Sequence, residues 1–176
     1  MQPILILTDT DLKQENIPHW NQDAVQVVST WKEKIASCCG CEDCWIKTPG
    51  KCRYPDAGME ICQQFAAATH LFVITKISFG VCSEPIQRVL ERLRPIQKPF
   101  SEQLQKETVR QMRAVAWKEA LFIGYGCDRE EEKTNFQQLT QQYVAALHLK
   151  SRTTACVCRE SVETVAEEAF KLWIRC

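Results

Sequence analysis

The sequence predicts an α/β protein built on a doubly wound parallel sheet. Short apolar runs of strand length alternate along the chain with segments whose apolar residues recur at helical spacing. Strands that alternate with helices imply right-handed crossovers between parallel strands. A chain of 176 residues suits one domain with a sizeable core, so we expect a single domain over residues 1–176.

Five segments have the length and composition of strands. The first, residues 4–7, is a continuous apolar tetrad, and the second, residues 24–28, is rich in β-branched side chains. Three more apolar runs, at 70–74, 120–125 and 154–158, complete the set. Five strands suit the flavodoxin-like order 2-1-3-4-5, in which ligands bind at the carboxyl ends of the strands around the switch point.

Helical spacing of apolar residues separates the later strands. It appears in residues 58–68, 83–93, 128–147 and 162–173. The second of these helices is expected to begin at an N-cap serine with a proline in its first turn, and the third to begin at a capping box. Residues 12–23 show no sustained helical stripe, so a helix after the first strand is predicted to be truncated or lost.

Charge and hydropathy exclude several classes of function. Lys plus Arg and Asp plus Glu balance at 22 each, which gives no footprint for nucleic acid and no polybasic membrane patch. No apolar run approaches the roughly 20 residues that span a bilayer. The first apolar stretch is too short for a signal peptide, so we expect a cytoplasmic protein whose cysteines remain reduced.

Five cysteines crowd residues 38–52, within a loop predicted to cover residues 38–58 after the second strand. Four of these thiols are spaced as ligands of a common metal or cluster would be, at Cys38, Cys41, Cys44 and Cys52. Four thiolates suit either zinc or an iron–sulfur cluster, and the alternative is a loop whose thiols pack or remain free. Cys39 is either a spare thiol or a substitute ligand.

The chain also resembles a known family in three segments. Residues 35–44, I-A-S-C-C-G-C-E-D-C, followed by Gly-Lys-Cys52 and Asp56, resemble the second-strand loop of the NADPH-dependent FMN reductases, which belong with the multimeric flavodoxins and the iron–sulfur flavoproteins. Residues 69–80, T-H-L-F-V-I-T-K-I-S-F-G, resemble the third strand and flavin-ring loop of that family, and residues 85–92 resemble its next helix.

The resemblance implies a flavodoxin-like fold, FMN as cofactor and a homodimer or larger homo-oligomer. In the iron–sulfur branch the four-cysteine motif holds a 4Fe–4S cluster, which favours this cluster over zinc here. No catalytic acid, base or nucleophile is required, because the cofactor carries the chemistry. The implied flavin-binding residues lie in three strand-end loops and are Thr8, Thr10, Thr75, Lys76, Ile77, Ser78, Phe79, Gly80, Gly124, Tyr125 and Gly126.

The first loop departs from the family pattern. An FMN phosphate needs hydroxyls, free backbone N–H groups and the positive end of a helix dipole. This chain instead places two carboxylates, Asp9 and Asp11, in the loop. In the ring loop the family's stacking aromatic is missing unless Phe79 replaces it, while Lys76 could pair with an anionic reduced flavin.

Two hypotheses for function follow. The first is an oxidoreductase similar to the NAD(P)H-dependent FMN reductases, in which FMN and a 4Fe–4S cluster pass electrons between NAD(P)H or a redox partner and an acceptor. The second is a degenerate flavodoxin-like protein that has lost FMN and serves as a binding or partner subunit. The first loop discriminates between them for the flavin, and the retained cysteines favour a redox role.

Overall fold

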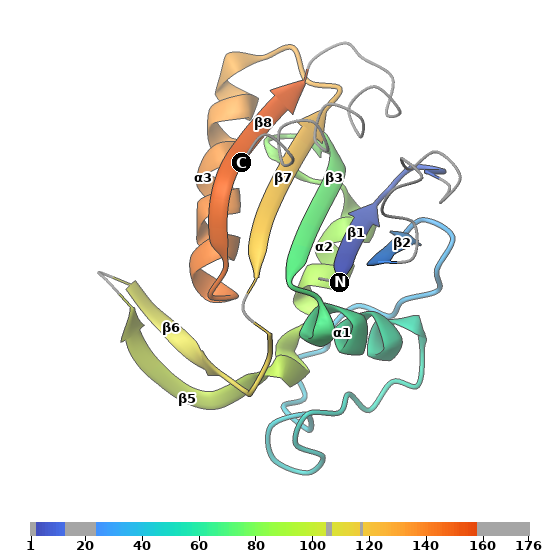
Figure 1. The fold of residues 1–176 in the computed structure, drawn as a ribbon, viewed down its shortest axis with the longest axis vertical. Helices are drawn as coiled ribbons and strands as arrows, with labels where there is room; N and C mark the ends of the chain where they lie inside the picture. Colours follow the sequence, from blue (N-terminus) through green and yellow to red (C-terminus); the bar gives the residue numbers. More distant parts are fainter. Residues whose placement is uncertain (1–2, 13–23, 105–106, 117, 158–176) are drawn as a thin grey trace.

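The computed structural model describes residues 3–12, 24–104, 107–116 and 118–157, with side chains described up to Lys150. Its central feature is a parallel sheet in the order β2-β1-β3-β7-β8 (Figure 1). This confirms the predicted α/β class with a mostly parallel central sheet. The five strands are β1 (Ile4–Thr8), β2 (Val25–Ser29), β3 (His70–Ser78), β7 (Glu119–Tyr125) and β8 (Lys150–Val157).

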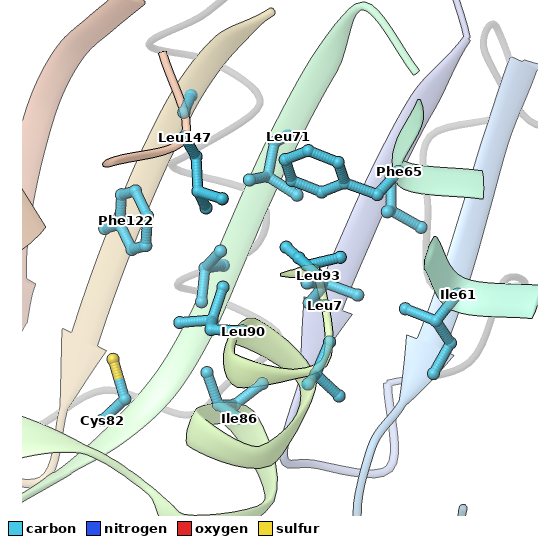
Figure 2. Close-up of a cluster of buried hydrophobic side chains, with 14 of the residues drawn as sticks. Leu7, Ile61, Phe65, Leu71, Cys82, Ile86, Leu90, Leu93, Phe122 and Leu147 are labelled. Carbon is cyan, nitrogen blue, oxygen red and sulfur yellow. The ribbon is translucent and has the colours of Figure 1, made fainter. Parts of the chain in front are cut away.

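The main hydrophobic core lies between the sheet and three helices on one of its faces. Figure 2 shows Phe65 from α1 beside Leu71 of β3, with Ile86 and Leu90 from α2 in the same buried cluster. Alternate strand residues point to the opposite face and form a second, smaller cluster, as the two-residue period of a strand requires. The helices are α1 (Ala57–Ala67), α2 (Glu84–Glu91) and α3 (Glu130–Ala146).

The third strand is longer than predicted. The predicted loop at 75–82 is a hairpin instead, because β3 continues to Ser78 and pairs with the short antiparallel strand β4 (Val81–Cys82). The turn between them uses left-handed backbone at Phe79 (φ +53°) and Gly80 (φ +78°). The prediction relied on a continuous apolar run, and polar side chains end that run before the strand ends.

A second hairpin was not predicted at all. After the 3-10 turn η3 (Arg94–Ile96), strands β5 (Gln97–Leu104) and β6 (Glu107–Met112) pair with each other and project away from the main sheet (Figure 1). Most of β5 is exposed. Its large apolar side chains, Phe100 and Leu104, are exposed, so no buried apolar run marked it as a strand.

The remaining predictions concern helices. The predicted capping box of the third helix is wrong, because α3 begins after Arg129 with no side-chain cap. The final helix predicted at 162–173 and most of the segment after the first strand, residues 13–23, lie outside the described residues. Among the described helices, none has the length and apolar character to cross a membrane.

Candidate functional site

The predicted site residues occupy opposite ends of the sheet. The carboxyl ends of β3 and β7 point to the top of Figure 1, where the three predicted flavin loops meet. The cysteine loop instead returns to the amino end of the sheet, below the strands and beside α1. The two candidate sites are therefore separate, and each can be assessed by itself.

A run of tight turns holds the backbone of the cysteine loop. The carbonyl of Glu42 accepts from the amides of Trp45 and Ile46, and the carbonyl of Cys44 accepts from the amide of Gly50. Left-handed backbone at Gly50 (φ +84°) is easily adopted by glycine. The turns bend the chain repeatedly, which is how cysteines distant in sequence face a common space.

A buried ion pair closes the base of this loop. Arg92, the C-cap residue of α2 and only 2% exposed, places both terminal nitrogens on the Asp56 carboxylate, at 2.9 and 2.7 Å. The same guanidinium donates to the carbonyls of Ala36 and Tyr54, while Asp56 accepts from the amides of Ala36 and Gly58. The two ends of the loop are thus fixed to each other and to α2.

The loop encloses a pocket lined by all five of its cysteines. Three arginines, Arg53, Arg92 and Arg94, also line it. The Nε–H of Arg92 is buried and has no hydrogen-bond partner in the described structure. A buried donor without an acceptor costs free energy unless a ligand supplies one. The other lining residues are Glu42, Tyr54, Glu91 and Pro95.

The thiols of the pocket differ in environment. Cys44 is buried, and loss of solvent raises the pKa of its thiol above the usual value. Cys39 is exposed, and a hydrogen bond to Tyr54, followed by hydrogen bonds to Cys41, lowers the pKa of its thiol. No three His, Cys, Asp or Glu side chains in the described residues are arranged to hold a single metal ion.

Trp45 anchors the loop against the rest of the protein. Its indole N–H donates to the carbonyl of Arg94 at 3.1 Å, and the side chain is 8% exposed. The guanidinium of Arg94 lies 4.1 Å from the ring centroid, and that of Arg110 lies 5.0 Å from it. Such cation–π contacts fix the loop to η3 and to the projecting hairpin.

At the carboxyl end of the sheet, Asp9 joins three strands. Its Oδ2 accepts from the backbone amide of Lys76 at 2.8 Å and lies 3.3 Å from the hydroxyl of Thr75. Its Oδ1 accepts from the hydroxyl of Tyr125 at 2.8 Å. Burial, and then the hydrogen bond to Asp9, raises the pKa of the Tyr125 phenol, so that this group remains a donor.

The other polar groups of the first loop are also engaged. The hydroxyls of Thr8 and Thr10 lie 2.8 Å apart, and Thr8 Oγ1 also accepts from the amide of Thr10. Asp11 forms an ion pair with Lys32. An FMN phosphate would need donors at this edge, but the amide of Lys76 and the hydroxyl of Tyr125 are bound to Asp9, and the hydroxyls of Thr8, Thr10 and Thr75 are engaged with neighbouring groups. In this arrangement these groups do not fit a phosphate.

The remaining predicted flavin residues divide between core and surface. Ile77 is 3% exposed and packs in the core, and a Cβ on Gly124 would lie 2.5 Å from its Cδ1 atom. Gly124 is therefore required for packing. By contrast, Phe79 is 88% exposed at the hairpin tip, while Gly126 adopts left-handed backbone (φ +73°) beside Lys76.

Sequence reasoning missed the residues that support both sites. It did not pair Arg92 with Asp56, although both lie in the segments that resemble the family. It also placed Asp9 in the first loop without a partner, because Tyr125 lies 116 positions away. No sequence signal links residues so far apart.

Comparisons with known proteins add evidence at the level of fold. No family model and no curated protein matches this chain. Among solved structures, the NAD(P)H:quinone oxidoreductase from Methanothermobacter marburgensis shares 12% identity over 96% of this chain and 94% of its own, with a TM-score of 0.62. A putative quinone reductase from Klebsiella pneumoniae shares 8% identity over 98% and 85%, with a TM-score of 0.64. The fold is flavodoxin-like.

A third similar structure was solved with a flavin. The FMN-dependent NADH-azoreductase from Bacillus anthracis, in complex with FMN, shares 10% identity over 98% of this chain and 95% of its own, with a TM-score of 0.55. Identities this low establish a common fold and no more. What the present chain binds must be argued from its own residues.

Proposed function

We propose that this flavodoxin-like chain is an electron-transfer protein whose redox centre is a 4Fe–4S cluster bound by Cys38, Cys41, Cys44 and Cys52. The observation that carries the proposal is one pocket that combines these four thiols with a buried, unpaired Arg92 N–H. A cluster would supply one-electron transfer, and its thiolates and sulfides would accept hydrogen bonds.

The pocket lining sets three arginines against two glutamates, Glu42 and Glu91, and so has an excess of positive side chains for such an anion. Four thiolates need nearby positive charge, and Arg53, Arg92 and Arg94 all line the pocket. Arg92 is held in place by Asp56, and its Nε–H would be available to an acceptor bound in the pocket. Hydrogen bonds to the sulfurs and burial are among the features that set the reduction potential of a cluster.

Zinc fits the same thiols less well. A tetrahedral ion with Zn–S bonds of about 2.3 Å needs its four sulfur atoms about 3.8 Å apart. The described side chains do not converge on a single ion in that way. In a cluster each thiolate binds a different iron, so a wider set of sulfurs is accommodated. Cys39, which is exposed and bound to Tyr54, is assigned no ligand role.

The partner is predicted to be NAD(P)H or a redox protein. NAD(P)H transfers a hydride, which is a two-electron step and calls for a flavin, whereas a redox protein can exchange single electrons with a cluster. A second depression adjoins the cysteine pocket, shares Cys38, Glu91 and Arg94 with it, and has Leu90 and Leu93 in its lining. We propose this depression as the approach to the cluster. Assembly as a homo-oligomer and a cytoplasmic location remain predictions.

The test is anaerobic purification and reconstitution with iron and sulfide, followed by iron and sulfide assays and a visible spectrum. We expect about four irons per chain and a broad absorption that bleaches on reduction. Cys38→Ser, Cys41→Ser, Cys44→Ser and Cys52→Ser should each lose most of it. Cys39→Ser is the control inside the loop, and Cys62→Ser is the control in the core.

Two results would contradict the proposal. Equal loss of iron from Cys39→Ser and Cys38→Ser would show that the ligands are assigned wrongly. A chain that stays colourless after reconstitution, with neither iron nor flavin, would instead support the second hypothesis, a flavodoxin-like binding or partner subunit without a redox centre.

A further inference from the structure

The strand-end donors at the carboxyl edge bind an anion that belongs to the chain itself. We propose that the Asp9 carboxylate is a built-in anion that takes the place of a bound phosphate and closes this edge to phosphate esters such as FMN. The similarity to FMN-dependent enzymes would then extend to the fold and not to the flavin. This inference does not depend on the cysteine pocket.

The contacts of Asp9 are those expected of a ligand. Its two oxygens receive donors from two other strands, the amide of Lys76 in β3 and the hydroxyl of Tyr125 in β7. Hydrogen bonds to a charged acceptor are shorter and stronger than neutral ones, and both of these measure 2.8 Å. One carboxylate thus holds the ends of β1, β3 and β7 together.

The threonine hydroxyls beside Asp9 are also engaged. The Thr75 hydroxyl lies next to Asp9 Oδ2 and also accepts from the amide of Ser83 at 2.9 Å. The hydroxyls of Thr8 and Thr10 bond to each other. A phosphate arriving here would have to displace Asp9 and then remain beside the displaced negative charge.

The experiment measures flavin binding to the full chain by fluorescence quenching, with FMN and riboflavin as probes. Riboflavin is the matched ligand because it lacks only the phosphate. The variants are Asp9→Ala, which removes the competing anion and frees its donors, and Asp9→Asn, which keeps the shape of the side chain. The matched control is Asp11→Ala, which removes a carboxylate two residues away that pairs with Lys32.

We expect both Asp9 variants to bind FMN at least tenfold more tightly than the unmodified chain, with no comparable gain for riboflavin. Asp11→Ala should bind FMN as the unmodified chain does. Circular dichroism confirms that the variants fold, and Asp9→Asn serves if Asp9→Ala does not.

Three outcomes would overturn the inference. One is an unmodified chain that already binds FMN as tightly as the Asp9 variants. Another is no gain of FMN affinity in any folded Asp9 variant. A third is an equal gain in Asp11→Ala, which would mean that total charge matters and the position of Asp9 does not. Loss of iron from the cysteine variants has no bearing on any of these.

Discussion

Hydrogen-bond donors at the two ends of the sheet differ in whether they have an acceptor. At the amino end, the cysteine loop surrounds a pocket lined by Arg92, a buried guanidinium whose Nε–H has no partner among the described residues. At the carboxyl end, where ligands of open α/β sheets bind, the donors of Lys76 and Tyr125 are bound to Asp9. The donor of Arg92 at the amino end lacks an acceptor, whereas the donors at the carboxyl end have one in the side chain of Asp9.

This difference shows that a shared fold does not decide which end of a sheet is functional. The carboxyl edge is the expected site from topology alone, yet the amide of Lys76 and the hydroxyl of Tyr125 already have an acceptor there in Asp9. Groups that remain unsatisfied after folding are the better indicator of a missing ligand, because burying them without a partner costs free energy. Arg92 is such a group, and Asp9 is not.

The largest effect is expected from breaking the ion pair under the cysteine loop. Asp56→Ala leaves the buried charge of Arg92 uncompensated and removes the N-cap of α1, so the free energy of unfolding should fall by about 4 kcal/mol. Urea unfolding followed by circular dichroism measures this. The control is Lys47→Ala, which breaks an exposed pair with Asp43 in the same loop and should cost about 0.5 kcal/mol or less. Similar losses in the two variants would mean that the pair does not anchor the loop.

The same pair predicts a loss of stability in acid. Burial alone would raise the pKa of Asp56, but hydrogen bonds from Arg92 and the amide of Ala36, with the charge of Arg92, lower it below its usual value. A carboxyl whose pKa is lower in the folded state contributes stability above the unfolded pKa of about 3.9 and loses it as pH falls further. Unfolding measured at about pH 6 and about pH 3 should therefore show a smaller difference in Asp56→Asn than in the unmodified chain. An equal difference would exclude Asp56 as the group responsible.

Much of the fold followed from the sequence because buried strands and amphipathic helices carry periodic signals. The apolar runs at 4–7 and 120–125 became β1 and β7 with shifts of one residue or less. The β5–β6 hairpin gave no such signal, since most of its residues are polar and, of those described, only Val109 is buried. Apolar periodicity indicates which side chains are buried, so it does not predict elements that bury few side chains.

The candidate sites were predictable in part. The spacing of the cysteines brought Cys38 and Cys52 together as ligands of one site, and both line the same pocket. The role of Asp9 was not predictable, because it depends on contacts with β3 and β7 that form only in the folded sheet. The sequence placed a carboxylate in the first loop but could not show which donors it binds.

The smallest effect is expected at the tip of the β3–β4 hairpin. Phe79 is 88% exposed and holds left-handed backbone at φ +53°, which costs a non-glycine residue about 1–2 kcal/mol. Phe79→Gly relieves that strain, partly offset by the greater freedom of glycine in the unfolded chain. The free energy of unfolding should therefore rise by about 0.5 kcal/mol, measured by urea unfolding. Phe79→Ala, which keeps the strain and loses little packing, should stay within about 0.5 kcal/mol of the unmodified chain.

A higher free energy of unfolding in Phe79→Gly would show that Phe79 does not stabilise the folded chain. The family resemblance implies a different role for an aromatic residue here, which is to stack on the flavin ring. Two cases are then open for this exposed aromatic side chain. Either it contacts a ligand or partner, or it has no binding role. The Asp9→Ala variant distinguishes these cases. If FMN binds there and Phe79→Ala in the same background weakens it, the ring stacks on the flavin once the edge is open. If FMN affinity does not change, Phe79 has no part in the site, and the edge differs from a flavin site in its aromatic residue as well as in its anion.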